Sequence, residues 1–309
     1  MILDFKLLNE TVERVIESTE EFKTEGNVAT YIPELANVDE NNFGLAIVTV
    51  DGKTILKGDT ELRFSMQSIS KVISLIMALE DNGTDYVFER IGCECSPYAF
   101  NHVNTITTKA ANPFVNAGAI STTAMIKGRD KEEKFQRFMD RIKKLSGDQG
   151  VTFLEKVYNS EMETTDTNRA LFYILRSKGI FDLEMDDVLN RYVAGCSVGV
   201  NVVNLAKIAA VLANGGKCLE TGDQLVEEDY VKITLAQMFT SGMYEESGKY
   251  QMTIGFPLKS GVSGGIMGVV PGKFGICTYS PRLDATGNSL RGIKVLEGLS
   301  KELGLSLFA

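Results

Sequence analysis

The chain has 309 residues, of which 44% are hydrophobic and 24% are charged, which suits a globular protein with a large core in one or two intimately joined domains. Its net charge of -9 argues against nucleic acid or an anionic membrane as a partner, because either would favour an excess of Lys and Arg. The five cysteines are odd in number and form no Cys-x-x-Cys motif, which predicts reduced thiols and a cytoplasmic location. We therefore expect a small-molecule partner.

The first predicted helix covers about 5–24. Charged residues interrupt its apolar positions, so the segment lacks the continuous apolar core of a signal peptide. A hairpin is predicted from 43–50 and 53–58, because the intervening Asp51-Gly52 pair favours a tight turn between antiparallel strands. No segment is long and apolar enough to span a bilayer.

Residues 68–240 are predicted to be mostly helical, beginning with a buried helix that Ser68 opens. Further helices are expected at about 116–126, 129–144, 150–159, 167–178, 184–192, 201–214 and 227–240. Strands are predicted at 250–254, 264–270 and 274–280, and a helix at about 289–303 ends the chain. Strands at both ends of a helical middle predict an α+β fold with one antiparallel sheet. We expect a sheet-containing part, 1–62 and 241–309, and a helical part, 63–240, in a single catalytic unit.

Ser68 and Lys71 form the only Ser-x-x-Lys motif in the chain. On a helix this spacing puts the amine and the hydroxyl on one face. Burial would lower the pKa of the amine, so that neutral Lys71 could accept the proton of a Ser68 nucleophile. The motif alone also allows a plainer interpretation, in which Ser68 is a helix cap and Lys71 a surface lysine.

Two other patterns are excluded as catalytic sites. His102 is the only histidine, so a His-rich metal site is impossible, and a loop or surface histidine is the favoured interpretation. The segment 261–265 matches Gly-x-Ser-x-Gly around Ser263, but that nucleophile motif requires a histidine further along the chain. The base in any nucleophilic mechanism is therefore Lys or Tyr.

Seven segments in chain order carry a resemblance to a known family. They are Tyr31-Ile-Pro-x-Leu, Gln67-Ser-Ile-Ser-Lys71, Asn112-Pro-Phe-Val-Asn-Ala-Gly-Ala-Ile120, Asp166-Thr-Asn168, Leu212-Ala-Asn-Gly-Gly216, Ser241-Gly-Met-Tyr244 and Lys259-Ser-Gly-Val-Ser-Gly-Gly265. With them the chain resembles the serine-dependent glutaminases of the β-lactamase and penicillin-binding-protein superfamily. The resemblance implies about five antiparallel strands flanked by helices, an all-helical subdomain, and hydrolysis of L-glutamine to L-glutamate and ammonia. It implies no metal, no organic cofactor, and a homodimer or homotetramer.

The resemblance also implies roles for the residues of the reaction. Ser68 would attack the side-chain amide and form an ester that water hydrolyses, with Lys71 as the proton acceptor. Tyr244, with a pKa expected to be lowered beside the ammonium, would relay a proton. The backbone amides of Ser68 and Val262 would form the oxyanion hole. Whether Lys71 or Tyr244 is the general base stays open.

Substrate binding is implied for Ser68, Tyr244 and Val262 together with Tyr31, Asn116, Glu161, Asn168 and Tyr192. Glu161 would pair with the ammonium of glutamine, and the amides and phenols would supply neutral hydrogen bonds. Without the resemblance, Asn116 and Asn168 are predicted to be helix caps. Likewise, Tyr192 would be half-buried packing and Glu161 a surface carboxylate. Lys259 and Ser260, which match the strand motif facing the nucleophile, are expected to support the site.

Two other functions stay open. A penicillin-interacting hydrolase shares the Ser-x-x-Lys chemistry but works outside the cytosol. The fold could also serve a non-catalytic sensor that binds an amino acid without turning it over.

Overall fold

The computed structural model describes residues 4–308 of the chain. Its larger sheet has five antiparallel strands in the order β2-β1-β8-β7-β6. They are β1 (Gly44–Thr49), β2 (Thr54–Gly58), β6 (Leu258–Ser260), β7 (Gly265–Val270) and β8 (Phe274–Tyr279). Because β1 pairs with β8 along its whole length, the sheet joins the two ends of the chain. The predicted α+β fold with five antiparallel strands is confirmed.

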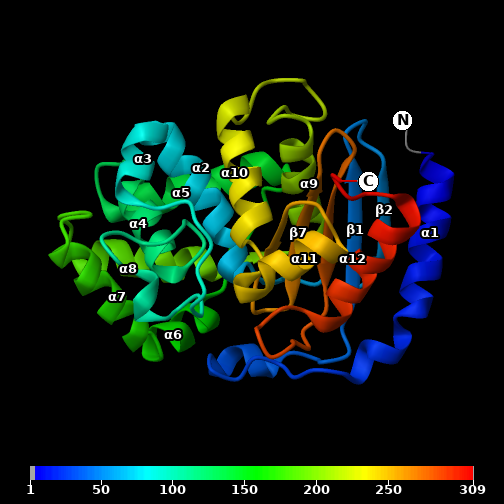
Figure 1. The fold of residues 1–309 in the computed structure, drawn as a ribbon, viewed down its shortest axis with the longest axis horizontal. Coiled ribbons are helices and arrows are strands. Elements are labelled where there is room, and N and C mark those ends of the chain that lie inside the picture. The colour runs from blue at the N-terminus through cyan, green and yellow to red at the C-terminus, as the bar shows by residue number, and fades with distance from the viewer. Residues whose placement is uncertain (1–3, 309) are drawn as a thin grey trace.

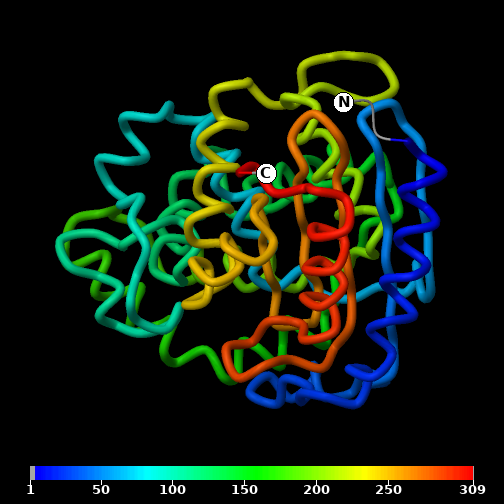
Figure 2. Tube along the Cα trace, turned by 45° about the vertical axis from the view of Figure 1, so that its right-hand side comes forward, coloured from blue at the N-terminus to red at the C-terminus, as the bar shows by residue number. Residues whose placement is uncertain are grey.

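Helices cover both faces of this sheet (Figure 1). On one face, α9 (Val202–Ala213) packs against β1, β7 and β8. The other face is covered by α12 (Leu290–Leu303), with α1 (Phe5–Ser18) beside it (Figure 2). Gly275 of β8 permits the close approach of α9, because a Cβ at this position would lie 2.2 Å from the backbone nitrogen of Ala210.

The segment between β2 and β6 is mainly helical, as predicted. At its centre lies α2 (Ser70–Asn82), in which every residue from Ser70 to Leu79 is buried. The other helices are α3 (Thr84–Arg90), α4 (Asn116–Met125), α5 (Lys131–Ser146), α6 (Glu155–Glu163), α7 (Asp166–Ser177), α8 (Met185–Cys196), α10 (Glu228–Ser241) and α11 (Ser247–Thr253). Since α9 lies within 63–240 but packs on the sheet, the two predicted parts share a core interface. The division into these parts stays a prediction.

A second, small sheet brings the chain into the centre of the molecule. Its strands are β3 (Phe64–Ser65), β4 (Thr152–Phe153) and β5 (Val198–Val200), in the order β3-β5-β4. Strands this short show no alternation of apolar and polar residues, which is why the sequence did not predict them. The sheet places the segment that follows β3 against β5, where the Met66 amide donates to the Val198 carbonyl over 2.8 Å.

The prediction of a strand at 250–254 is wrong. These residues belong to α11 and to the position after it, and the edge strand is β6 instead. Tyr250 and Ile254 are buried, whereas Gln251 and Met252 between them are not. This i, i+4 spacing fits one face of a helix, and a short apolar run does not distinguish it from a strand.

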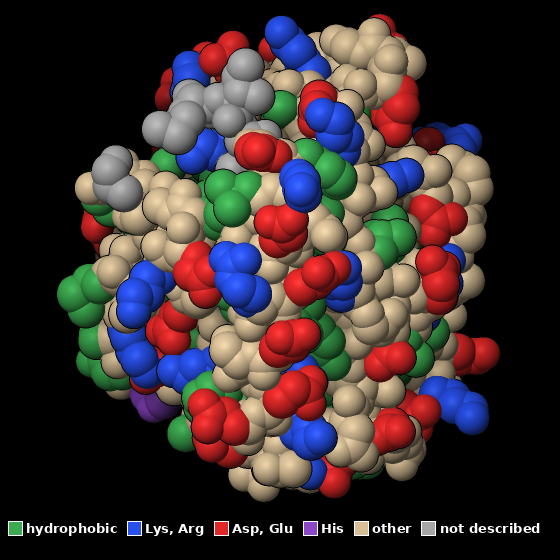
Figure 3. Space-filling model, turned by 90° about the vertical axis from the view of Figure 1, so that its right-hand side faces the viewer, with side chains coloured by type: hydrophobic (Ala, Val, Ile, Leu, Met, Phe, Trp, Pro, Cys, Tyr) green, Lys and Arg blue, Asp and Glu red, His purple; other side chains and the backbone are tan. Residues whose placement is uncertain are grey.

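The surface that includes α1 carries acidic and basic side chains mixed together (Figure 3). The opposite side of α1 is apolar, with Leu8, Val12 and Val15 buried, as expected for an amphipathic helix. Among residues 4–308, no helix is both long enough and apolar enough to cross a membrane.

Candidate active site

Ser68 lies in a strained turn at the entry to α2. The 3-10 helix Gln67–Ile69 directly precedes α2, so Ser68 lies just before the α-helix rather than within it. Gln67 has φ of +46°, which costs free energy in a residue with a side chain and is commonest at functional sites. The turn therefore holds Ser68, which is buried, at a fixed position beside the helix N-terminus.

Lys71 is fully buried in the first turn of α2. Its amine donates hydrogen bonds to the carbonyl of Phe114 (3.1 Å) and to Oδ1 of Asn116 (2.6 Å). Burial lowers the pKa of Lys71 to about 8, although the nearby Cys196 and Glu161 oppose this shift. A substantial fraction of the amine is therefore neutral near physiological pH. The alternative of a surface lysine is wrong.

Tyr244 is a second buried group next to the nucleophile. Its backbone has φ of +56°, and its phenol donates to the carbonyl of Ser260 over 3.2 Å. Burial raises the pKa of Tyr244, and the neighbouring Ser68 and Ser260 only partly oppose this. The expected lowering of this pKa is wrong, because the loss of water around the phenolate outweighs the charge of Lys71.

Lys259 and Ser260 of β6 are fully buried on the other side of Tyr244. The Lys259 amine donates to the carbonyls of Ser260 (2.7 Å) and Gly242 (3.3 Å) and lies 4.9 Å from the centre of the Tyr244 ring. Burial, together with the charge of Lys71, holds the pKa of Lys259 well below its usual value. Both residues therefore border the reacting groups, as expected from their position in the sequence.

Val262 lies in a turn that closely approaches the nucleophile. Gly261 makes this possible, because a Cβ at this position would lie 2.8 Å from the carbonyl oxygen of Met66. The turn is closed by the amide of Gly264, which donates to the Gly261 carbonyl over 2.9 Å. Val262 itself is buried, and its Cγ1 lies within 3.3 Å of a Cβ built on Gly287. The backbone of 261–264 thus faces the turn that holds Ser68.

A cavity of about 180 Å³, here named the main cavity, lies next to Ser68. The side chains that we predicted for substrate binding gather around it: Tyr31, Ser68, Asn116, Glu161, Asn168 and Tyr192. Five of these come from separate segments between residues 31 and 192, so only the folded chain brings them together. Tyr31 stands at the mouth with 54% of its surface exposed, whereas Tyr192 is 5% exposed and lies inside.

Glu161 of α6 places a buried carboxyl group in the main cavity. Burial raises its pKa to about 7, and the Gln67 hydrogen bond and the charge of Lys71 oppose this shift. Nε2 of Gln67 donates to Oε2 of Glu161 over 3.2 Å. The alternative of a surface carboxylate is therefore wrong. A buried acid without a cation bonded to it fits a site for a positively charged group.

Asn116 and Asn168 belong to a chain of hydrogen-bonded side chains. Nδ2 of Asn116 donates to Oδ1 of Asn168 (2.9 Å), and Nδ2 of Asn168 donates to Oγ1 of Thr165 (2.9 Å). The prediction that both are helix caps is wrong, because neither side chain accepts a bond from the amides of its helix. Since Asn116 also accepts from Lys71, this chain links the catalytic amine to the main cavity.

Comparison with known proteins identifies the family. A model of the family Glutaminase matches residues 26–308. A Glutaminase of Clostridium tetani (strain Massachusetts / E88) is 42% identical over 306 residues, which cover 98% of this chain and 100% of the relative. The chain belongs to the glutaminase family. It is an enzyme, a hydrolase of the glutaminase type, with a β-lactamase-like fold.

Solved glutaminase structures resemble this one closely. The probable glutaminase ybaS has a TM-score of 0.95 at 38% identity, covering 99% of both chains. The Bacillus subtilis glutaminase YbgJ, solved as a covalent complex with 5-oxo-L-norleucine formed by reaction with 6-diazo-5-oxo-L-norleucine, has a TM-score of 0.86 at 35% identity. That match covers 98% of this chain and 99% of YbgJ.

Several residues of this glutaminase-family site were not predicted from the sequence. Gln67, Phe100, Asn101, Thr165 and Cys196 also line the main cavity. Gln67 could have been recognised, because it directly precedes the nucleophile in the Ser-x-x-Lys segment. The others have no motif of their own, and only the tertiary structure brings them to the cavity.

The excluded candidates take no part in the site of this glutaminase-family enzyme. His102 is exposed, and its Nδ1 accepts a hydrogen bond from the Asn104 amide over 3.1 Å. The Ser263 hydroxyl is buried without a hydrogen-bond partner among the described residues. The five cysteines are free. Residues 4–308 contain no group of three or more His, Cys, Asp or Glu side chains that could hold a metal ion.

The raised pKa of Glu161 predicts a cost in stability. Because the folded state binds the Glu161 proton more tightly than the unfolded state, this group makes stability fall as the pH rises from its ordinary pKa of 4.5 to about 7. Glu161→Gln should therefore stabilise the protein by about 2–3 kcal/mol more at pH 8 than at pH 5. Urea unfolding of both proteins at the two pH values measures this difference, and an equal effect at both would contradict the prediction.

Proposed function

We propose that this protein hydrolyses the side-chain amide of L-glutamine through a glutamyl ester of Ser68. The observation that carries the proposal is a single cavity that joins a buried serine to a buried carboxyl group. An amino acid with an amide at the end of its side chain has an ammonium for Glu161 and an amide carbon for Ser68. The family membership supports the same substrate.

Binding would change the ionisation of Glu161. The ammonium of glutamine would compensate the desolvation that raises the pKa of Glu161, so that the carboxylate pairs with it inside the cavity. The Asn116 and Asn168 amides, already oriented by their shared hydrogen bond, and the Tyr31 and Tyr192 phenols would hydrogen bond to the rest of the amino-acid group.

Acylation would use Lys71 as the general base. The amine is near neutrality, whereas the raised pKa of Tyr244 keeps the phenol protonated, which favours Lys71 over Tyr244 for this step. The printed hydrogen bonds of the amine go to Phe114 and Asn116 rather than to Ser68, and such contacts often tighten only when substrate is bound. Lys71 would take the proton as the Ser68 oxygen bonds to the amide carbon, and Tyr244 would pass a proton to the leaving nitrogen as the carbon–nitrogen bond breaks.

The transition state would be stabilised by two backbone amides, those of Ser68 and Val262. Donors of this kind contribute roughly 3–4 kcal/mol to lowering the barrier. Water would then attack the ester, with the same groups moving the proton in reverse, and release glutamate. Lys259 and Ser260 would shape the site around Tyr244.

The substrate assignment predicts a strong preference for glutamine over asparagine. The asparagine amide lies one methylene closer to the ammonium and would miss Ser68, so kcat/KM should fall by roughly 100-fold or more. Ammonia release from both substrates measures the ratio. Equal rates would contradict the assignment. Binding of glutamine without turnover would favour the sensor, and acylation of Ser68 by a β-lactam would favour the penicillin-interacting hydrolase.

The cytoplasmic location and the homodimer or homotetramer are also proposed. Native mass spectrometry of the full chain reports the oligomeric state directly.

A further inference from the structure

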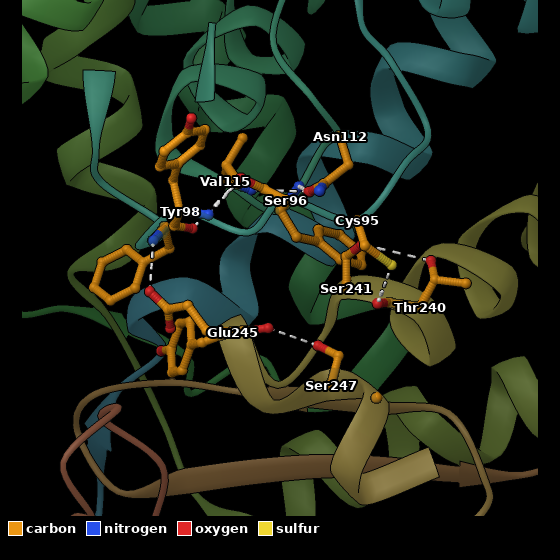
Figure 4. Close-up of a pocket in the computed structure, with 13 residues that line it drawn as sticks. Cys95, Ser96, Tyr98, Asn112, Val115, Thr240, Ser241, Glu245 and Ser247 are labelled. Atoms are coloured by element: carbon orange, nitrogen blue, oxygen red, sulfur yellow. Dashed lines mark hydrogen bonds between the residues drawn. The ribbon is translucent and has the colours of Figure 1, made fainter. Parts of the chain in front are cut away.

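A second cavity, here named the side cavity, lies beside the catalytic residues (Figure 4). Its volume is about 60 Å³, enough for a few water molecules. At its outer end, Cys95, Tyr98, Glu245 and Gly248 are exposed to solvent. At its inner end it reaches the buried ring of Tyr244. The side cavity therefore extends from the surface to a group that contacts the reaction centre.

One pair of aromatic rings separates the two cavities. Phe100 lines both of them. Its ring centre is 4.7 Å from that of Tyr244 and 5.7 Å from the Lys71 amine. Phe100 is partly exposed and lies outside the regular helices and strands, so its side chain has more freedom to rotate than a core residue.

The order of the proposed reaction requires a second route. After the carbon–nitrogen bond breaks, ammonia must leave and water must arrive while the glutamyl group still occupies the main cavity. We propose that the side cavity is this route, through which small uncharged nucleophiles such as water and ammonia exchange with the acyl-enzyme. The proposal rests on the acyl-enzyme mechanism given above.

The lining of the side cavity suits such molecules. The hydroxyls of Ser96, Ser241 and Ser247 and the carboxylate of Glu245 border it, and these groups bond to water and to ammonia or ammonium. Figure 4 shows Cys95 beside Thr240 at one side and Glu245 at the other. Oε1 of Glu245 accepts from the Phe100 amide over 3.1 Å, so the outer end of the cavity is connected to the residue that closes the inner end.

Gly248 offers a way to fill the side cavity without disturbing the fold. It lies in α11, and no other atom lies within 4 Å of a Cβ built on it. Gly248→Leu should therefore add bulk to the cavity, and the helix tolerates Leu better than Gly. Gly248→Ala is the matched control with a smaller side chain. Ser241→Leu adds bulk from α10 and tests the same cavity independently.

Partitioning between water and hydroxylamine measures access to the acyl-enzyme. Water converts the Ser68 ester to glutamate, whereas hydroxylamine, which is larger than water, converts it to glutamyl hydroxamate. In each case the nucleophile bonds to the ester carbon and Ser68 regains its proton. The ratio of the two products is independent of the acylation rate and of the folded fraction, so a general structural defect does not change it.

We expect both Leu variants to lower the hydroxamate-to-glutamate ratio by roughly tenfold, the discrimination that one added methylene group gives in a tight site. Gly248→Ala should lie between them and the wild type. A wild-type ratio in both Leu variants would overturn the route while leaving the acyl-enzyme mechanism intact. Absence of hydroxamate from the wild type would overturn the route as well. Labelling of Ser68 by 6-diazo-5-oxo-L-norleucine would then show whether the mechanism itself still stands.

Discussion

Ser68→Ala should lower kcat for glutamine by at least about 10⁴-fold, since removing the nucleophile leaves only binding and oxyanion stabilisation. The change removes one oxygen from a buried side chain, so the fold should be retained. Steady-state ammonia release measures the loss, and thermal unfolding confirms the fold. Glutamate should still raise the unfolding temperature of the variant, because Glu161 and the amide chain are unchanged.

Ser263→Ala is the matched control for this experiment. Ser263 is also a buried serine, it lies in the other sequence motif that resembles a nucleophile site, and its hydroxyl has no hydrogen-bond partner among the described residues. Its replacement should leave turnover near the wild-type value. Peptide mapping after reaction with 6-diazo-5-oxo-L-norleucine should find the label on Ser68. Turnover by Ser68→Ala at the wild-type rate would contradict the mechanism.

Lys71→Met should lower kcat/KM by roughly 10³- to 10⁴-fold, because general-base catalysis typically contributes up to this amount. The pH profile tests the assignment more sharply than the rate. In the free enzyme, Lys71 must be neutral and Glu161 ionised, with pKa values of about 8 and about 7. Wild-type kcat/KM should therefore fall as the pH drops below about 8, and fall more steeply below about 7.

Each variant should remove one of these two limbs. Lys71→Met should keep only the limb near pH 7, and Glu161→Gln only the limb near pH 8. Tyr244→Phe should lose activity but keep both limbs, because its raised pKa places its titration above this range. A Tyr244→Phe profile without the limb near pH 8 would instead make Tyr244 the general base.

The sequence determined the elements whose signals are local. The Asp51-Gly52 turn predicted the hairpin of β1 and β2, and the spacing of Ser68 and Lys71 predicted one shared face at the start of α2. The motifs also predicted which side chains gather at the main cavity, because the family pattern records contacts that spacing cannot. The segment 250–254 failed, since a short run with buried residues four apart fits either a strand or a helix.

Only the tertiary structure decided the ionisation of the site. The charge of Lys71 predicted a lowered pKa for Tyr244, but the structure buries the phenol completely, and desolvation outweighs the neighbouring charge. The caps predicted at Asn116 and Asn168 became a hydrogen-bonded chain to Lys71 because α4 and α7 meet α2 across the cavity. Burial and contacts between distant segments depend on how the whole chain packs. Local spacing does not record them, so the sequence could name the reacting groups but not their protonation states.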